Sequence, residues 1–426
     1  MLIAKFISLT VFFFSFALSS HAQVWTLQNS PVTTELDGIC AVSGQVCWAC
    51  GPLNTIIRTT NGGGIWLVVN NGISGNFYDM HATDINHAWA GSDDGKIWYT
   101  SNGGNNWQYS IPNPPTPFID AIRMFDNITG VSIGDPPVNA VQWRFYFTTN
   151  GGINWNICPG APPIDSETTW SNALFAIDTG HIWWGTNRSK IYMGSMRGPC
   201  FGFNVNAQNQ YGLAFQDFNT GVALGIVGNP PDTQTFNLRT ITGGNNWYST
   251  AFLPASIPYG IASCPSVSSS FYWIAATDDI YRSTDNGISF SSQINLTSAS
   301  YCISMRNVDT GWAAGANGKI YKYTANDPIG IFREQKTVPD GYHLFQNYPN
   351  PFNPETTIGF SLPERSIVII EIFELSGKKI STLLDSYKDS GSYSISYIPS
   401  GLSSGIYIYT LRSGSFFEAK KMVLLK

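Results

Sequence analysis

Short runs of apolar residues alternate with polar turn residues along the chain, and one turn pattern recurs. Its first copy is Thr59-Thr60-Asn61-Gly62-Gly63-Gly64-Ile65-Trp66, and its general form is Ser/Thr-x-Asn/Asp-x-Gly-x-x-aromatic. A short polar side chain at the third position can accept hydrogen bonds from backbone amides across a tight turn, and glycine at the fifth supplies a positive φ. The aromatic residue then begins the next strand and can pack against a neighbouring sheet.

The five copies share these positions and therefore predict five similar turns. Their key residues are Thr59, Asn61, Gly63 and Trp66; Thr100, Asn102, Gly104 and Trp107; Thr148, Asn150, Gly152 and Trp155; Thr240, Gly244 and Trp247; and Ser283, Asp285, Gly287 and Phe290.

The spacing of the copies predicts the architecture. Two further units lack the turn but keep the strand before it, as Lys190-Ile191-Tyr192 and Lys319-Ile320-Tyr321, which resemble Lys96-Ile97-Trp98. Equivalent positions then fall at residues 59, 100, 148, 194, 240, 283 and 323, with a mean step of 44 residues. A step of this length is typical of one four-stranded propeller blade. We therefore predict an all-β fold with a seven-bladed β-propeller over residues 23–324.

The last unit ends without an aromatic residue to begin an outer strand. The segment Val24–Leu27 offers a strand at the other end of the repeats. We expect it to pair with Ile320–Tyr323, which would close the ring and leave no open sheet edge.

The repeated turn resembles the Asp-box (BNR repeat) of sialidase-type and photosystem-assembly-factor-like propellers, and the resemblance covers roughly residues 24–324. It implies that the boxes are structural turns on outer hairpins, remote from the ligand face, and that the ring is a non-enzymatic binding scaffold. Sialidase activity is disfavoured, because the propeller contains only the glutamates Glu35 and Glu167. Arg58, Arg239 and Arg282 occupy one repeated strand position at the edge of a box, which indicates a structural role.

Residues 1–22 have the pattern of a secretory signal peptide. Lys5 precedes an apolar core over Leu9–Leu18, and Ser20-His21-Ala22 is a small-x-small cleavage site. No later segment reaches the roughly 18 apolar residues of a membrane helix, so we expect no transmembrane segment in the mature chain. Residues 23–327 carry 12 Lys and Arg against 19 Asp and Glu. That acidic balance would repel phosphate backbones, so nucleic acid is not an expected partner.

The seven cysteines all lie between Cys40 and Cys302. Cys47 and Cys50 have the spacing of a redox motif, but no helix follows as such a motif requires. No compact Cys/His pair follows to complete a zinc site. We therefore predict no metal and no cofactor, and favour a Cys40–Cys47 disulfide across the turn between two strands.

Beyond Thr324 the repeat ends and the composition changes. Residues 325–342 read as a linker, because they combine charge changes with Val338-Pro339-Asp340-Gly341. Residues 343–426 then show short alternating strands and predict an immunoglobulin-like β-sandwich. The expected strands are Thr356–Leu362, Ser366–Leu375, Lys379–Leu384, Tyr393–Tyr397, Gly405–Arg412 and Phe416–Leu425.

The motifs of this region closely resemble the type A C-terminal sorting domain of the Bacteroidetes type IX secretion system. The resemblance implies Sec export, passage across the outer membrane by the type IX secretion machinery, and a secreted or surface-attached product. An ordinary sandwich does not require a Pro-rich start and a basic last strand together. The motif residues are Tyr348, Pro349, Asn350, Pro351, Phe352, Asn353, Pro354, Gly405, Tyr407, Lys420 and Lys421.

The ligand face is expected on the long inserts of blades three to five, because propeller function usually lies in loops built out from one face. Candidate contacts there are Asp135, Asp165, Trp143 and Trp170. The tryptophans could stack on sugars or anchor a protein, and their alternative role is packing between blades. We therefore predict a secreted or surface-displayed propeller that binds a protein or glycan.

The alternative function is a carbohydrate-active hydrolase or lyase on the same ring. Such an enzyme needs two carboxylates set roughly 5–9.5 Å apart across a cleft. The candidate acids are Asp93 with Asp94, Asp135, Asp165 with Glu167, and Asp278 with Asp279. Paired acids in loops also serve as solvated turn residues.

Overall fold

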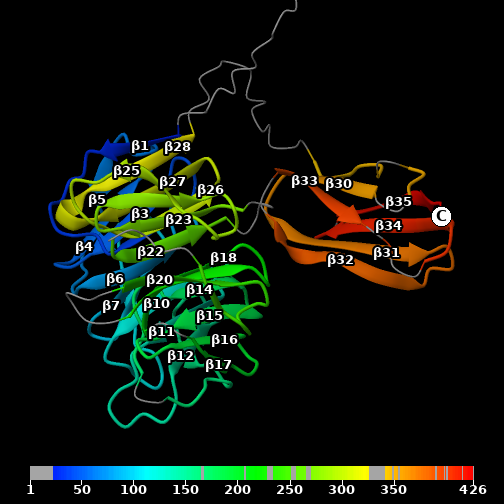
Figure 1. Cartoon of the computed structure of the whole chain (residues 1–426). Coiled ribbons are helices and arrows are strands. Elements are labelled where there is room, and N and C mark those ends of the chain that lie inside the picture. Colours follow the sequence, from blue (N-terminus) through cyan, green and yellow to red (C-terminus); the bar gives the residue numbers. More distant parts are fainter. Residues whose placement is uncertain are drawn as a thin grey trace, which may run out of the picture. The chain divides into compact units, whose positions relative to one another are not determined.

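Seven four-stranded antiparallel sheets make up the chain from residue 23 to residue 325 in this computed structural model (Figure 1). The predicted seven-bladed β-propeller is confirmed. In chain order the sheets are β2 Gly38–Ala41, β3 Cys47–Gly51, β4 Thr55–Thr59 and β5 Trp66–Val68; β6 Phe77–Ala82, β7 Ala88–Ser92, β8 Ile97–Thr100 and β9 Gln108–Ser110; β10 Ile119–Met124, β11 Gly130–Gly134, β12 Arg144–Thr148 and β13 Asn156–Ile157; β14 Leu174–Asp178, β15 His181–Gly185, β16 Lys190–Gly194 and β17 Phe201–Asn204; β18 Gln208–Phe215, β19 Gly221–Val227, β20 Gln234–Thr240 and β21 Tyr248–Ser249; β22 Pro258–Ser263, β23 Tyr272–Ala276, β24 Asp279–Ser283 and β25 Ser291–Asn295; and β26 Ser300–Asn307, β27 Thr310–Gly315 and β28 Ile320–Ala325 with β1 Gln23–Gln28.

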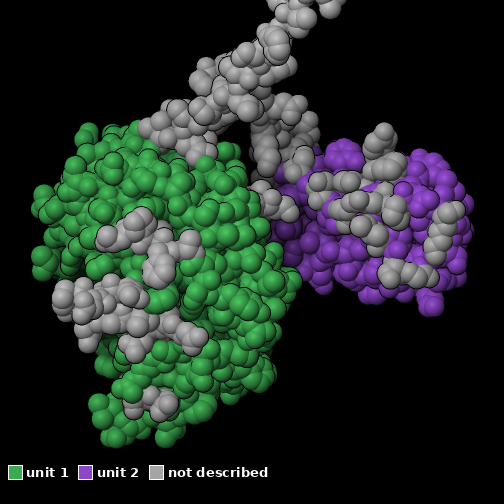
Figure 2. Space-filling model, in the orientation of Figure 1, with its two compact units in different colours: residues 1–327 green, residues 328–426 purple. Residues whose placement is uncertain are grey.

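Two compact units divide the chain, residues 1–327 and 328–426 (Figure 2). The structure describes residues 23–164, 167–205, 208–227, 234–250, 256–264, 270–325, 341–347, 350–353, 356–388, 391–397, 399, 402–414 and 416–425. The expected signal peptide, most of the linker and insert 228–233 lie outside these ranges, as do Asp165, Tyr348, Pro349 and Pro354.

The first strand of each sheet lies toward the centre of the ring. These inner strands, β2, β6, β10, β14, β18, β22 and β26, each contact the next around the ring, and β26 contacts β2. Small residues make this approach possible. A Cβ added to Gly38 on β2 would lie 3.0 Å from the Asp79 Cα on β6. The blades therefore pack against one another at backbone distance near the centre.

The seventh sheet is completed by the N-terminal strand, as predicted. β1 pairs antiparallel with β28, with Trp25 opposite Tyr323 and Leu27 opposite Tyr321. The Trp25 side chain is buried beside Tyr323 and joins a core cluster that includes Trp273 of the preceding sheet. The ends of the repeat region therefore meet in one sheet, which closes the ring.

The five repeated turns share one hydrogen-bond pattern. The first-position hydroxyl accepts a bond from the fifth-position glycine amide at 2.8–3.0 Å in every copy. The third-position side-chain oxygen accepts a bond from the amide four residues later at 2.9–3.0 Å. All five of these glycines have a positive φ. These side chains accept hydrogen bonds from the amides of their own turns, as expected for a turn-forming motif.

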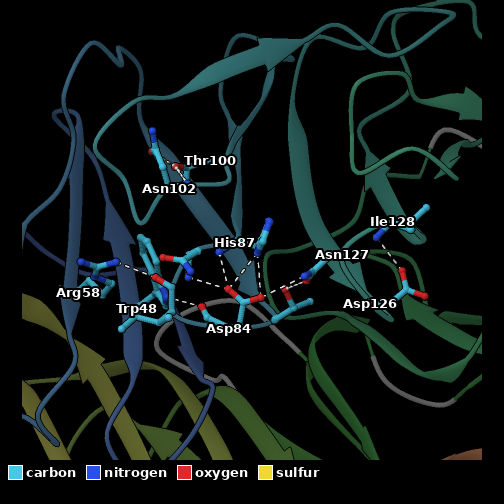
Figure 3. Close-up of polar contacts among 12 residues, drawn as sticks. Trp48, Arg58, Asp84, His87, Thr100, Asn102, Asp126, Asn127 and Ile128 are labelled. Atoms are coloured by element: carbon cyan, nitrogen blue, oxygen red, sulfur yellow. Dashed lines mark hydrogen bonds and ion pairs between the residues drawn. The ribbon is translucent and has the colours of Figure 1, made fainter. Parts of the chain in front are cut away.

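Polar contacts at this end of the ring link neighbouring blades (Figure 3). The Trp48 indole N–H donates to the Asp84 carbonyl at 3.3 Å, and the Arg58 guanidinium donates to the Ile85 carbonyl at 2.7 Å. The Asp84 carboxylate in turn accepts a bond from Asn127 of the next blade at 3.1 Å. Arg58 thus joins two blades from the repeated strand position at which a structural role was expected.

Seven cysteines of the described chain are unpaired, and the expected Cys40–Cys47 disulfide is wrong. The register of β2 and β3 places Cys40 opposite Trp48 and Ala41 opposite Cys47. Neighbouring residues of a strand point to opposite faces, so the two thiols face different core clusters. Burial raises the pKa of both thiols, which leaves them unreactive as nucleophiles.

The second unit is a sandwich of two antiparallel sheets. Its first sheet orders β29 His343–Leu344, β30 Thr356–Leu362 and β33 Gly391–Tyr397, and its second orders β32 Lys379–Lys388, β31 Ser366–Glu374, β34 Gly405–Ser413 and β35 Phe416–Leu424. Alternate residues such as Ile358, Ile370 and Leu411 face a shared core. The six predicted strands are all present, and β32 continues to Lys388, four residues beyond its predicted end.

Candidate ligand face at the start of the inner strands

The antiparallel topology sorts the propeller loops into two faces. In a four-stranded meander, the segment before the first strand and the loop between the second and third strands lie at the same end. The repeated turns, between the third and fourth strands, lie at the opposite end. We call the first end the start face, because all seven inner strands begin there.

Five of the seven inner strands carry a β-bulge close to their first residue. The unpaired residue of each bulge is Tyr78 in β6, Asp120 in β10, Tyr211 in β18, Tyr259 in β22 and Tyr301 in β26. A bulge locally disrupts pairing and turns one side chain away from the regular alternation. The repeat therefore places four tyrosines and one aspartate at a single structural position around the start face.

Three of the bulge tyrosines make aromatic contacts between neighbouring blades. Tyr259 and Tyr301 meet edge to face with ring centroids 5.1 Å apart, and Tyr78 lies 4.9 Å from Phe118. The side chains of Tyr78, Tyr259 and Tyr301 are half-buried. Half-buried aromatic rings at a common edge offer apolar area together with a polar phenol tip.

Glu35 and Asp37 lie near two of these tyrosines. Burial raises the pKa of Tyr78 and of Tyr301, and the charges of Glu35 and Asp37 raise both further. Burial, with the charge of Glu35, raises the pKa of Asp37 to about 7. The buried Asp37 Oδ2 has no hydrogen-bond partner within the described residues. Asp37 thus sits between the first and last blades with part of its carboxyl unsatisfied.

Asp120 is a second acid with an unsatisfied oxygen. Its side chain is only 4% exposed, and Asp120 Oδ2 has no hydrogen-bond partner among the residues that the structure describes. Burial raises its pKa well above the usual value, and the nearby charges of Asp135 and Asp79 add to the effect. Asp79 is equally buried but is satisfied, because the Ile122 amide donates to it at 2.8 Å and Arg123 at 2.7 Å.

The residues predicted for the ligand face divide between surface and core. Asp135 follows β11 on the start face, and the Thr169 amide donates to its carboxylate at 3.3 Å. Trp170 follows Thr169 in the segment between β13 and β14, and its side chain is 38% exposed. Trp143 is fully buried and contacts Trp184 and Tyr192, which fits its alternative role in packing between blades.

The bulge residues were not identified from the sequence. They recur at about the blade repeat, which is the signal that could have revealed them. Sequence alone did not separate them from core positions, because a bulge is a property of the pairing between strands.

In the second unit, the Pro-rich segment and the last strand form one bonded structure. Asn350 Oδ1 accepts a bond from the Val423 amide at 2.8 Å, and Phe352 forms a parallel bridge with Leu424. The Phe352 amide donates to the Val423 carbonyl at 2.9 Å. The predicted motif residues from both ends of the domain are therefore joined along the edge of β35.

The other motif residues of this domain lie on β34 and β35. Gly405 pairs with Leu424 at the end of the sheet. The Tyr407 hydroxyl donates to the Ser403 carbonyl at 2.7 Å. Lys420 forms an ion pair with Glu418 at 3.0 Å, and Lys421 is exposed.

Comparison with known proteins identifies the second unit. Residues 346–425 match the family model described as "Secretion system C-terminal sorting domain". The chain is thus a β-propeller protein with a type IX C-terminal sorting domain, and this domain directs it to the cell surface or the exterior. Within the described residues, no helix is long and apolar enough to cross a membrane. No group of three or more His, Cys, Asp and Glu side chains there is arranged to hold a metal ion.

The propeller resembles solved structures at low sequence identity, and the comparison with curated proteins found no match. A structure described as "YCF48 bound to D1 peptide" is 17% identical, with a TM-score of 0.55 over 71% of this chain and 97% of that chain. YCF48 from Cyanidioschyzon merolae is 15% identical, with a TM-score of 0.54 over 70% and 98%. A streptogramin B lyase is 16% identical, with a TM-score of 0.54 over 71% and 98%. At these identities the likeness shows the fold alone.

Proposed function

We propose that this protein is an exported binding protein whose propeller holds a protein or glycan ligand on the start face. The observation that carries the proposal is the repeated bulge, which places Tyr78, Tyr259 and Tyr301 at one structural position near the start of the inner strand in three blades. Tyrosine is well suited to binding surfaces, because it adds a large contact area and loses little side-chain entropy on binding. YCF48 gives a precedent for a peptide ligand on this fold.

Two features support a binding role over a structural one for these tyrosines. Each is half-buried, although the inner-strand residues beside it, such as Phe77 and Ser300, are almost fully buried. The regular alternation of the strand would have provided a core position without any bulge. Bulges are enriched next to functional sites, where they aim a side chain.

The proposal can be tested by comparing a start-face variant with a matched control. The full chain would be screened on glycan and peptide arrays, together with Y259A/Y301A and with Y248A. Tyr248 is an exposed tyrosine of the outermost strand β21, 57% exposed, and serves as the control. We expect the double variant to lose the ligands that the wild type and Y248A retain. Equal binding by all three proteins would exclude the start face.

A carbohydrate-active enzyme on the same face is the second candidate function, and Asp120 is the observation that favours it. Burial and the nearby charge of Asp135 raise its pKa, which is the direction that a general acid requires. Release of reducing sugar from a polysaccharide panel would be measured for the wild type, D120N and D135N. Turnover that disappears in both variants would support the enzyme, and ligand binding without turnover would contradict it.

A further inference from the structure

Two carboxylate oxygens of the start face are buried and lack a hydrogen-bond partner within the described chain, Asp37 Oδ2 and Asp120 Oδ2. Buried polar atoms are nearly always satisfied, because an unpaired one loses its hydration and gains nothing in return. Asp120 is the sharper case, since its side chain is 4% exposed. An unsatisfied buried carboxylate indicates a place where a donor from outside the chain can bind.

Three cations of the neighbouring blades are paired with other acids. Arg123 pairs with Asp79 at 2.7 Å, Lys190 pairs with Glu167 at 2.7 Å, and Lys96 pairs with Asp94. No ion pair in the described part of the chain uses Asp37 or Asp120. These two acids are therefore left without a counter-charge by their own protein.

Aromatic side chains lie within electrostatic range of the rim acids. Tyr301 meets Tyr259 edge to face with ring centroids 5.1 Å apart, and the charges of Glu35 and Asp37 act on both Tyr78 and Tyr301. A cation between a carboxylate and the face of a tyrosine gains both ion pairing and cation–π attraction. A neutral sugar hydroxyl would donate a hydrogen bond but would leave the charge uncompensated.

We propose that the start face binds a lysine or arginine side chain presented by a segment of a partner protein. This inference rests on the proposed binding function and specifies its ligand. A metal ion fits less well, because the described acids, histidines and cysteines do not gather into a coordinating group of three. The Asp37 subsite lies at the half-buried rim between the first and last blades, and the Asp120 subsite lies deeper, beside Asp135.

Binding of the cation is coupled to proton release. The groups around the rim subsite are Glu35, Asp37, Asp93, Tyr78, Tyr259 and Tyr301, and Asp37 must be ionised to attract a cation. Around the deeper subsite, Asp120 faces Asp135 and Asp79, and Arg123 compensates only Asp79. Affinity should therefore rise with pH as these carboxyls ionise, and it should fall with salt.

The probe is a short fluorescein-labelled peptide in which lysine alternates with glycine, measured by fluorescence anisotropy with the full chain. Two analogues replace the lysines by norleucine and by glutamate. We expect the lysine peptide alone to bind, and D37N/D120N to weaken its binding roughly tenfold or more. The control is D309N, which removes an exposed acid from the turn between β26 and β27, at the opposite end of the blade. It should bind like the wild type.

The possible outcomes distinguish the cationic ligand from the proposed binding function of the start face. Equal binding of the lysine and norleucine peptides, or an unchanged affinity in D37N/D120N, would overturn the cationic ligand. If an uncharged glycan or peptide instead binds and is lost in Y259A/Y301A, the proposed function stands and this inference fails. If Y259A/Y301A retains every ligand of the wild type, both fail. Circular dichroism of each variant confirms that the loss is not unfolding.

Discussion

Trp25 lies against Tyr323 with ring centroids 5.1 Å apart, although the two residues stand at opposite ends of the propeller sequence. Tyr323 also contacts Trp273 of the neighbouring blade at 6.0 Å. The first strand is therefore anchored both to its own sheet and to the next one. Closure of the ring depends on packing as well as on the backbone pairing of β1 with β28.

W25A should lower the free energy of unfolding of the propeller by about 3–5 kcal/mol, because it removes a buried indole and leaves a cavity. Unfolding in guanidinium, followed by tryptophan fluorescence, measures the loss. L27A is the control, since Leu27 lies on the same strand but is 58% exposed. Similar stability for the two variants would show that β1 does not close the ring.

G104A should destabilise the second blade more than G72A does. Both glycines have a positive φ, so alanine strains either backbone by about 1 kcal/mol. An added Cβ at Gly104 would also lie 2.9 Å from the Val69 carbonyl, whereas the space around Gly72 is open. The difference in unfolding midpoint between the two variants measures the steric part alone. No difference would mean that the turn adjusts freely.

D37N should change how stability depends on pH. The folded-state pKa of Asp37 is about 7, above the value near 4 of an unfolded aspartate, so the folded protein binds this proton more tightly. Its contribution is fully present below about pH 4, is lost as pH rises to about 7, and stays lost above that.

The variant should therefore match the wild type in acid and exceed it at pH 8 by roughly 1–2 kcal/mol, a figure reduced for the solvent screening of a half-buried group. Thermal unfolding across this pH range checks the prediction. A stability difference that does not vary with pH would contradict the raised pKa.

N350A should reduce delivery of the protein to the cell surface. The substitution removes the acceptor of the Val423 amide and loosens the bond between the Pro-rich segment and the last strand. Immunoblots of periplasm, surface and medium would compare it with S376A, an exposed hairpin residue, and with a chain that ends at Thr324. The truncated chain should accumulate in the periplasm. Normal delivery of the truncated chain would contradict export through the sorting domain.

Features made by neighbouring residues could be predicted from the sequence. Each repeated turn is held by side chains bonded to amides four residues away, so its chemistry appears as a local motif. The spacing of these motifs then predicted the number of blades, and the missing outer strand indicated the pairing of Val24–Leu27 with Ile320–Tyr323.

Features that depend on strand register could not be predicted in the same way. Cys40 and Cys47 are close in sequence, but pairing of β2 with β3 sends their thiols to opposite faces. The shared position of the bulge tyrosines on the start face depends on strand pairing, because a bulge is defined only once an inner strand is paired with its neighbour. Trp143 was a candidate ligand contact with packing between blades as its alternative role, and the structure places it in a core cluster of two blades.

The pairing of Gln23 with Ala325 brings the start of β1 and the end of β28 together at one end of their sheet. A short hairpin could join them, and new termini could then be opened at a repeated turn such as Asn102–Gly104, which is held by its own side chains. Such a circular permutant would keep every blade while moving the point at which the tail is attached. The blade at which the chain begins could therefore change, whereas the order of blades around the ring is fixed by their packing.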